Sequence, residues 1–223
     1  TCALPISKDL PLCEGNYDTW NECFGIKKFR RHELYQNDIY EGEWKDGRFD
    51  GRGTYTSKSR LNKYVYKGSF KKGKFDGPGI MTANNAVLIT NFIDGEMEGE
   101  VIINYPNGDK LIGNASNNQI NGNGKYLSAN GDKYEGDLKD GKINGQGRLT
   151  LVNGNEYIGE FKNGLYHGRG VYISKNGRKD TGEFIDGQLN GEGVTYWPNG
   201  AKYTGSFKNW QRHGKGTAIY KDG

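Results

Sequence analysis

Five Asn-Gly dipeptides recur in this chain at a fixed interval of 23 residues, from Asn107-Gly108 to Asn199-Gly200. A fixed period of this length is typical of repeat proteins, in which short supersecondary units stack on their neighbours. Alignment on this period gives eight copies of one unit, which start near residues 40, 66, 88, 111, 134, 157, 180 and 203. The sequence therefore predicts an array of repeats and not a single globular core.

Each unit begins with alternating residue types. Tyr40, Gly42 and Trp44 fall on one face of an extended strand, and Glu41 and Glu43 fall on the other, because strand side chains alternate with period 2. Successive copies of the aromatic position would lie two strands apart, about 9 to 10 Å, which exceeds ring contact distance. We therefore expect the aromatic row to interleave with side chains of the intervening strand.

The second half of each unit is rich in glycine. After a turn at Asp46-Gly47, the returning strand carries Gly51, Gly53 and Tyr55, which we expect on a common face, so that a ring on one strand lies over bare backbone on the next. The Asn-Gly pairs would then join consecutive units through type I′ turns, since both central residues of that turn need positive φ. The predicted fold is all-β, an elongated single-layer antiparallel meander of about eight hairpins, a solenoid-like twisted ribbon.

The repeat resembles the MORN (membrane occupation and recognition nexus) repeat. Its pattern, Tyr-x-Gly-x-aromatic followed by Gly and Gly-x-Gly, is clear in YEGEWKDGRFDGRGTY at 40–55 and YIGEFKNGLYHGRGVY at 157–172, and the resemblance covers 40–223. The segment LPLCEGNYDTWNECFG at 10–25 is similar to the cysteine-bearing leader that precedes such arrays in bacterial envelope proteins. The resemblance implies the bacterial cell envelope or periplasm, with the cytoplasmic face of a membrane as the alternative.

Three copies depart from the pattern: 88–103, 111–126 and 180–195. The first has Thr90 and Val101 where glycines belong, and the second has Ala115 in the aromatic slot. Because the stability of a repeat array is nearly a sum of local terms, we expect the units 88–103 and 111–126 to open first.

All three cysteines, Cys2, Cys13 and Cys23, precede the array. We predict a leader or cap over 1–39 and the repeat array over 40–223. Cys13 and Cys23 flank a short polar loop and could form a disulfide across this cap, or could be two buried free thiols. Cys2 could be the lipid-bearing first residue of a lipoprotein, for which Thr1 is a poor predecessor. The absence of an initial Met and the end at Gly223 suggest a fragment or a processed form.

Basic residues are concentrated in the stretch from Lys58 to Lys74, which contains no acidic residue. An inserted basic hairpin end could contact anionic lipid headgroups, whereas the alternative is a charged edge that keeps sheets from pairing. The candidate lipid contacts are Lys58, Arg60, Lys63, Lys67, Lys71, Lys72 and Lys74.

A second candidate surface is aromatic. Tyr166 with His167, and Trp210 with Arg212 and His213, fall near within-repeat turns on one edge, and such groups are frequent in binding hot spots. Trp210 could equally staple the last repeat onto the array.

Catalytic and cofactor sites are not predicted. His167 and His213 occupy equivalent positions two units apart, about 19 Å by strand spacing, so they cannot share a metal or a proton. The glycine-rich strings lack a phosphate-loop signature, no pair of His or Cys has zinc-ligand spacing, and no apolar run is long enough for a transmembrane helix. A net charge of +4 does not indicate nucleic acid binding. We therefore expect that the chain is not an enzyme and needs no cofactor or metal. We expect it to act as a scaffold that binds or tethers a protein partner, with a membrane or the cell envelope as its candidate location. The alternative hypothesis is a lipid-targeting or regulatory module of a larger enzyme whose catalytic domain lies elsewhere.

Overall fold

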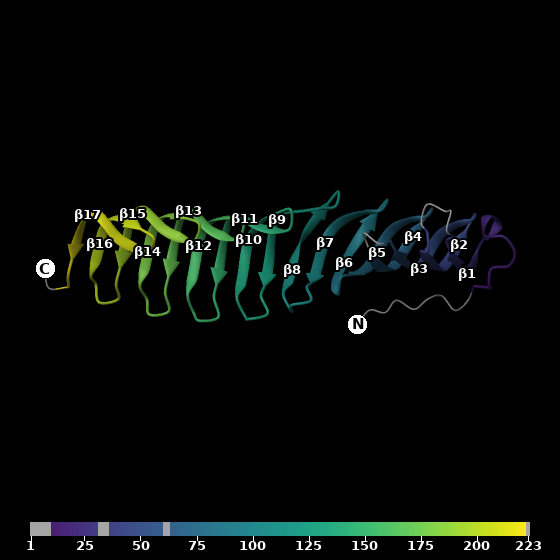
Figure 1. Ribbon diagram of the computed structural model, residues 1–223, viewed down its shortest axis with the longest axis horizontal. Helices are drawn as coiled ribbons and strands as arrows, with labels where there is room; N and C mark the ends of the chain where they lie inside the picture. The colour runs from purple at the N-terminus through teal and green to yellow at the C-terminus, as the bar shows by residue number, and fades with distance from the viewer. Residues whose placement is uncertain (1–9, 31–35, 60–62, 222–223) are drawn as a thin grey trace. The chain divides into compact units, whose positions relative to one another are not determined.

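The computed structural model describes residues 10–30, 36–59 and 63–221, so Cys2 and Arg60 lie outside the described residues. It contains two compact units, one within residues 1–108 and 114–119 and the other comprising 109–113 and 120–223. In each unit, antiparallel strands follow one another in chain order as a single layer (Figure 1). The predicted all-β meander of hairpin repeats is confirmed.

The first unit begins with a 3-10 turn, η1 (Tyr17–Thr19), which seven strands follow. These pair consecutively in antiparallel register. They are β1 (Cys23–Lys28), β2 (Ile39–Lys45), β3 (Arg48–Lys58), β4 (Lys63–Lys71), β5 (Lys74–Ala83), β6 (Ala86–Ile93) and β7 (Glu96–Asn104).

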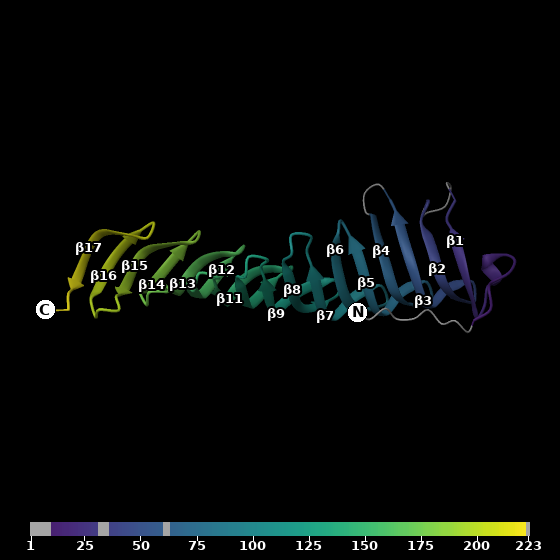
Figure 2. The ribbon, with the colours of Figure 1, turned by 90° about the horizontal axis from the view of Figure 1, so that it is seen from below.

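The division between the units falls within β8 (Lys110–Ser116) and at the start of β9 (Gln119–Leu127). In the second unit, β9 to β17 again pair in chain order, and the hairpins of this unit are seen from below in Figure 2. The remaining strands are β10 (Lys133–Lys139), β11 (Lys142–Thr150), β12 (Glu156–Lys162), β13 (Leu165–Ile173), β14 (Lys179–Ile185), β15 (Gln188–Tyr196), β16 (Lys202–Lys208) and β17 (Gln211–Ile219).

The described turns within the repeats have positive φ at both central residues, and one turn between repeats, Asn84-Asn85, likewise has φ of 49° and 63°. Asp46 and Gly47 have φ of 50° and 69°, so both central residues of the β2–β3 turn are left-handed, as a type I′ turn requires. Each turn within the repeats also bonds to its neighbour, since the amide of Gly73 donates to the carbonyl oxygen of Phe49 at 2.8 Å and the amide of Gly164 donates to that of Ile143 at 2.9 Å. The repeats are therefore coupled in series along this edge, which we call the within-repeat turn edge.

The prediction that the Asn-Gly pairs form type I′ turns is wrong. Of Asn130 and Gly131, only the glycine has positive φ, 103°. The amide of Gly131 donates to the carbonyl oxygen of Ser128, and that of Ser128 donates to the carbonyl oxygen of Asp132. This is a three-residue loop, a tight turn followed by a left-handed glycine. The asparagine stays right-handed because its side-chain oxygen accepts the amide proton of Asp132 at 3.0 Å.

The aromatic core is built as the sequence predicts, with rings from alternate strands interleaved. Tyr40 on β2 stacks on Phe49 from β3 at 3.8 Å between ring centres and meets the edge of Phe70 from β4 at 4.9 Å. Tyr40 is fully buried, and a methyl group at Gly53 would lie 2.6 Å from its ring. The expected ring over bare backbone is therefore present.

The prediction that Gly51 shares a face with Gly53 is wrong. The pairing of β2 with β3 shifts between Gly42 and Trp44, and Gly51 lies at this bulge with φ of 93°. A methyl group there would meet the Glu43 carboxylate on the opposite face. A bulge adds residues to one strand and so changes the face of those that follow, which strict alternation cannot anticipate.

The degraded copy at 88–103 is packed in a different way from the others. Leu88 replaces the usual tyrosine, and the space left by the smaller side chain is filled by Val101, which is fully buried, and by Thr90. The Thr90 hydroxyl donates to the carbonyl oxygen of Glu100 at 2.9 Å. Three side chains of medium size, Leu88, Thr90 and Val101, thus occupy the volume that a tyrosine ring over two glycines occupies in the other repeats.

The leader contains half a repeat that the sequence did not reveal. Gly25 on β1 pairs with Gly42 as Gly53 does, and the Trp20 ring covers Gly25. The carbonyl oxygen of Trp20 accepts the amide proton of Gly47 at 2.8 Å, the role that Phe49 plays one repeat later. The segment up to β1 thus imitates a returning strand, which is what a terminal cap of a repeat array must do. The predicted boundary at residue 39 stays a prediction.

A disulfide joins Cys13 to Cys23. The amide of Cys13 donates to the carbonyl oxygen of Phe24 at 2.8 Å. The amide of Phe24 donates to the carbonyl oxygen of Pro11, also at 2.8 Å. The leader is therefore fastened along the outer edge of β1 by a covalent bond and two backbone hydrogen bonds.

Candidate functional site

A hollowed surface of the first unit lies along the within-repeat turn edge, between the β2–β3 and β4–β5 turns. We call it the turn-edge cleft. Lys45 pairs with Arg48 beside the first turn, Lys71 pairs with Lys74 beside the second, and Phe70 forms an apolar wall. The charged residues that line it are the cations Lys45, Arg48, Lys71 and Lys72 and the carboxylates Asp46, Asp50 and Asp76.

Two of these carboxylates also position the turns. An Asp50 oxygen accepts the amide proton of Lys72 at 3.1 Å, and an Asp76 oxygen accepts that of Asp94 at 3.3 Å. The same role falls to Asn121 and Asn190 later in the chain. In these four repeats the side chain before the Gly-x-Gly therefore caps the turn of the next repeat. The cleft has only one more cation than carboxylate, so its field is mixed and not strongly positive.

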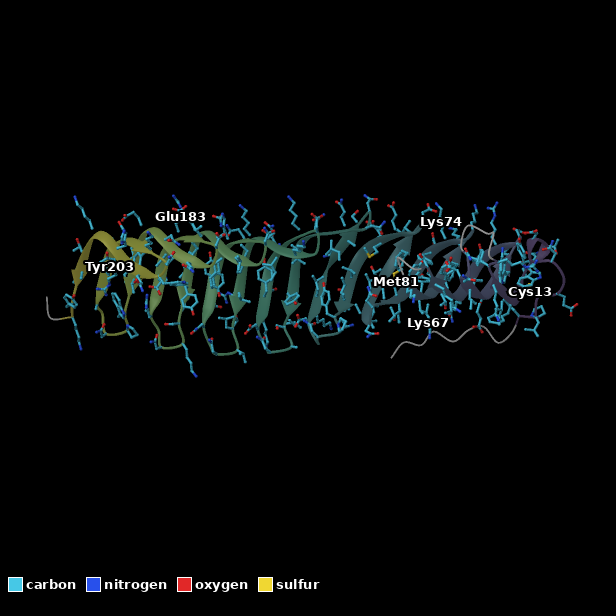
Figure 3. The ribbon with its side chains drawn as sticks, viewed as in Figure 1. Cys13, Lys67, Lys74, Met81, Glu183 and Tyr203 are labelled. Carbon is cyan, nitrogen blue, oxygen red and sulfur yellow. A yellow bond between two sulfur atoms is a disulfide. The ribbon has the colours of Figure 1, made fainter. Side chains whose placement is uncertain are left out.

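The seven predicted lipid contacts do not form one patch. Lys58 pairs with Lys63 at one end of the β3–β4 hairpin, whereas Lys71, Lys72 and Lys74 lie at the other end. The length of β4 separates Lys63 from Lys71 by about 26 Å. Lys67 lies between these ends, and Figure 3 shows it well apart from Lys74.

Lys74 also contacts a carboxylate, since its ammonium lies 3.4 Å from Asp94. Both side chains are exposed, so this ion pair contributes little stability, but it lowers the local positive charge. The basic residues are therefore contiguous in sequence but form two separate groups in the structure. The two ends of β4 lie at opposite edges of the sheet, so the residues at its start and at its end are far apart.

The predicted partner contacts are divided between the core and the surface. Tyr166 stacks on Tyr157 at 4.0 Å and belongs to the aromatic row, and Trp210 lies against Tyr172 at 5.0 Å and Phe184 at 5.5 Å. Trp210 thus packs against rings of the two preceding repeats and joins the last repeat to them.

The other three predicted contacts do not form one site either. His167 is partly buried on β13 and its Nδ1 atom lacks a hydrogen-bond partner, whereas Arg212 and His213 are exposed on β17. Of the five residues, only Arg212 and His213 are displayed to solvent.

The tyrosines of the core are poor acids. Burial raises the pKa of Tyr134 to about 12, and the neighbouring Asp137 adds to the effect. Burial likewise raises the pKa of Tyr40 far above its ordinary value, with further contributions from Glu43 and Asp50. The hydroxyl of Tyr40 donates to the backbone carbonyl oxygen of Glu43 at 2.8 Å, and the hydroxyl of Tyr134 donates to the backbone carbonyl oxygen of Asp137 at the same distance. These hydroxyls therefore tie each ring to its bulge and stay protonated at neutral pH.

Sequence reasoning missed Lys45, Arg48, Asp50 and Asp76 as members of a common site. A signal for them exists, because the interval from Gly42 to Gly68 is 26 residues, so residues 46–50 must lie beside 72–76 once the repeats stack. Among the described residues, no group of three or more His, Cys, Asp or Glu side chains is arranged to hold a metal ion. No helix in the described part of the chain has the length and apolarity needed to cross a membrane.

The fold and the cleft define a class: an all-β repeat protein whose hairpins are coupled through their turns and whose variable side chains lie at the turn edges. The chain belongs to the MORN repeat family. The family model matches residues 40–60, 66–85, 113–133, 134–156, 157–177, 181–202 and 203–223. The hairpin β6–β7 lies outside these matches and has the repeat's geometry with a different packing.

Similarity to solved structures is distant. The chain is 15% identical to the wild-type TCP10 domain of Danio rerio CPAP, with 79% of this chain and 80% of that chain covered and a TM-score of 0.32. It is 14% identical to the G-box domain of the microcephaly protein CPAP, with coverages of 82% and 80% and a TM-score of 0.27. A comparison with curated proteins gave no match.

Proposed function

We propose that this chain is a non-catalytic scaffold that binds a protein partner in the turn-edge cleft. The observation that carries the proposal is the alternation of cations and carboxylates around Phe70 on two consecutive repeats. An anionic bilayer attracts cations and repels carboxylates, whereas a folded protein or peptide can match both signs with complementary groups.

The rigidity of the cleft supports the same proposal. Lys72 is held in its turn by the hydrogen bond from its amide to Asp50, and the second residue of that turn, Gly73, is bonded to Phe49. A surface whose backbone is fixed on both sides loses little conformational entropy when a partner binds.

The proposed location is an oxidising compartment such as the bacterial periplasm or cell envelope. The Cys13–Cys23 disulfide supports this, since structural disulfides persist in such compartments and are rare in the cytosol.

A photo-crosslinking experiment tests the proposed surface. A crosslinking residue replaces Lys72 in one sample and Lys139 in the other, because Lys139 lies beside the equivalent turn of the second unit. The proposal expects a protein adduct from the native extract at position 72 that is absent at 139. The adduct is then purified, and its affinity is measured for the wild-type chain and for the variants Lys71→Glu and Lys139→Glu.

Loss of binding of about tenfold or more in Lys71→Glu alone would support the cleft. Equal affinity of both variants would contradict it. Binding to anionic vesicles without any protein adduct would favour the alternative of a lipid-targeting module.

A further inference from the structure

The leader and β1 form another hollow in the first unit, where η1 lies beyond β1 (Figure 1). We call it the leader pocket. Its volume is about 400 Å³, which is within the range of roughly 300 to 1,000 Å³ that small-molecule sites occupy. Tyr17 and Trp20 line it from the leader, and residues 26–28 and Arg30 line it from the strand side.

The charged groups that line the leader pocket have one sign. They are Lys27, Lys28 and Arg30, and none of the acids of residues 14–22 is among its described lining residues. The turn-edge cleft, by contrast, alternates cations with carboxylates. Three cations in one small pocket favour an anion that carries more than one charge.

Lys27 occupies a position that other repeats fill with an uncharged side chain. It pairs with Tyr40 on one side of β2, as Tyr55 does on the other side. The equivalent residues of β5 and β7 are Met81 and Ile103. Packing within the array therefore favours an apolar or aromatic residue at this position, so packing does not explain the lysine.

Two aromatic rings orient the Lys27 ammonium at the pocket. Its Nζ atom lies 3.5 Å from the centre of the Tyr17 ring and 4.5 Å from that of the Phe29 ring. The face of a ring attracts a cation through its quadrupole and does not neutralise the positive charge. The ammonium group is therefore held in place and remains a cation.

The leader side of the pocket is fixed by several contacts. The disulfide joins the leader to β1, and the amide of Trp20 donates to the carbonyl oxygen of Tyr17 at 3.2 Å. The indole of Trp20 donates to the carbonyl oxygen of Glu14 at 3.1 Å, and its ring meets that of Trp44 edge-on at 4.9 Å. A site whose groups are held in place before binding loses little conformational entropy when a ligand arrives.

The lining groups fit a phosphate monoester better than a carboxylate. A phosphate monoester carries about −1.5 to −2 charges at neutral pH and has three acceptor oxygens. The planar guanidinium of Arg30 can bind two oxygens at once, and the two lysine ammonium groups add donors that act as point charges. Trp20 and the half-exposed Ile26 provide an apolar wall that the organic part of the ester can contact.

We propose that the leader pocket binds a soluble phosphate monoester, with Lys27, Lys28 and Arg30 around the phosphate group. The same group occurs on lipid headgroups, but the leader also carries the exposed acids Glu14, Asp18 and Glu22, which an anionic bilayer repels. The described lining residues of the leader pocket and of the turn-edge cleft do not overlap, so either proposal can fail while the other holds.

Phenyl phosphate tests the inference, because phenyl sulfate has a similar shape and only one negative charge. Binding of each to the disulfide-bonded wild-type chain is measured by isothermal titration calorimetry at about pH 8, where the phosphate ester is a dianion. Inorganic phosphate is the third probe, and vesicles that contain a lipid with a phosphate monoester headgroup are the fourth. Hydrogen exchange over residues 13–28 shows where the ligand binds.

We expect phenyl phosphate to bind about tenfold or more tightly than phenyl sulfate, to bind more tightly than inorganic phosphate, and to protect residues 13–28. Lys28→Gln should weaken its binding about tenfold or more, whereas Lys139→Gln, which removes the same charge from β10, should leave it unchanged. Lys27→Met keeps an unbranched side chain against Tyr17 and should weaken binding by a similar factor. If Lys27→Met disturbs the leader, the exposed Lys28 still allows the test.

Four results would overturn the inference. Absence of phenyl phosphate binding would show that the pocket is not a ligand site, and equal affinity for phenyl sulfate would show that it does not select a doubly charged anion. Equal losses in Lys28→Gln and Lys139→Gln would mean that the net charge of the chain, and not the pocket, attracts the ester. Binding to the vesicles without binding to phenyl phosphate would assign these cations to a membrane surface.

Discussion

The contact between a tyrosine ring and bare backbone predicts a position-specific cost for adding a single methyl group. In Gly170→Ala, the new methyl carbon would lie 2.3 Å from the Tyr157 hydroxyl oxygen and 2.5 Å from the ring carbon that bears it. Real methyl carbons essentially never approach within 3.0 Å of another heavy atom, so the ring or the strand must move.

The Tyr157 ring has little freedom to move. It stacks on Tyr166 at 4.0 Å, contacts the edges of Phe161 at 5.1 Å and Phe184 at 5.0 Å, and its hydroxyl lies 3.1 Å from the carbonyl oxygens of Glu160 and His167. Overpacking typically costs about 1 to 3 kcal/mol, and loss of the hydroxyl's hydrogen bond costs about 1 kcal/mol more. We therefore expect Gly170→Ala to lower the free energy of unfolding by about 2 to 4 kcal/mol.

The chain supplies a matched control. Gly193 is the equivalent glycine of the repeat in which Asp180 replaces the tyrosine, and a methyl group there would lie 3.2 Å from the nearest atoms of Phe207 and 2.9 Å from a backbone oxygen. Because its contacts with a ring are longer but the backbone oxygen still lies within 3.0 Å, Gly193→Ala should cost less than Gly170→Ala, about 1 to 2 kcal/mol. Both variants are measured by chemical denaturation and by hydrogen exchange over residues 157–172. Equal destabilisation by the two substitutions, or no effect of Tyr157→Leu on the cost of Gly170→Ala, would refute the ring-over-backbone explanation.

Three further results are expected. Hydrogen exchange should be faster in 111–126 than in the fully aromatic hairpins, with 88–103 intermediate because Val101 refills its core; uniform protection would contradict this. Because the basic residues form two separate groups beside carboxylates, flotation with anionic vesicles should be weak and salt-sensitive, and should fall further on mutation to Ser of Lys71, Lys72 and Lys74; equal flotation on neutral vesicles would exclude a role for these cations. Burial raises the pKa of Tyr134 to about 12, so its contribution to stability is complete below about pH 10 and is lost as the pH rises toward 12. A melting temperature that is constant from pH 9 to 12, roughly the range in which tyrosine ionises, would show that this burial is not maintained in solution.

The sequence predicted the strands, their alternation and the interleaved rings, because period-2 patterning and ring dimensions are local properties. It did not identify the turn types. Asp46-Gly47 and Asn130-Gly131 look alike as dipeptides, and the loop that each forms depends on whether a side chain such as that of Asn130 accepts the amide proton two residues later. The strict alternation also failed at Gly51, where a bulge changes the face of the residue.

The candidate site was harder to predict than the fold, for a geometric reason. A run of bases such as Lys58 to Lys74 is contiguous in sequence, yet a hairpin places its ends at opposite edges. Residues that do meet, such as Asp50 and Lys72, are separated by nearly one whole repeat. Functional groups on a repeat array must therefore be sought by position within the unit, across neighbouring units, and not by proximity along the chain.

The packing also explains how such a chain can vary its surface without losing its fold. Tyr40 with Gly42 and Gly53, and Leu88 with Thr90 and Val101, are two solutions to the same volume problem, and each is confined to one hairpin and its neighbours. The hydrogen bonds that couple neighbouring repeats are mostly between backbone groups at the turns, as in Gly73 with Phe49. They therefore do not depend on the exposed side chains nearby. Lysines, carboxylates and Arg212 can therefore change at the edges at little cost in stability, which makes the edges the part of the molecule where binding specificity can be encoded.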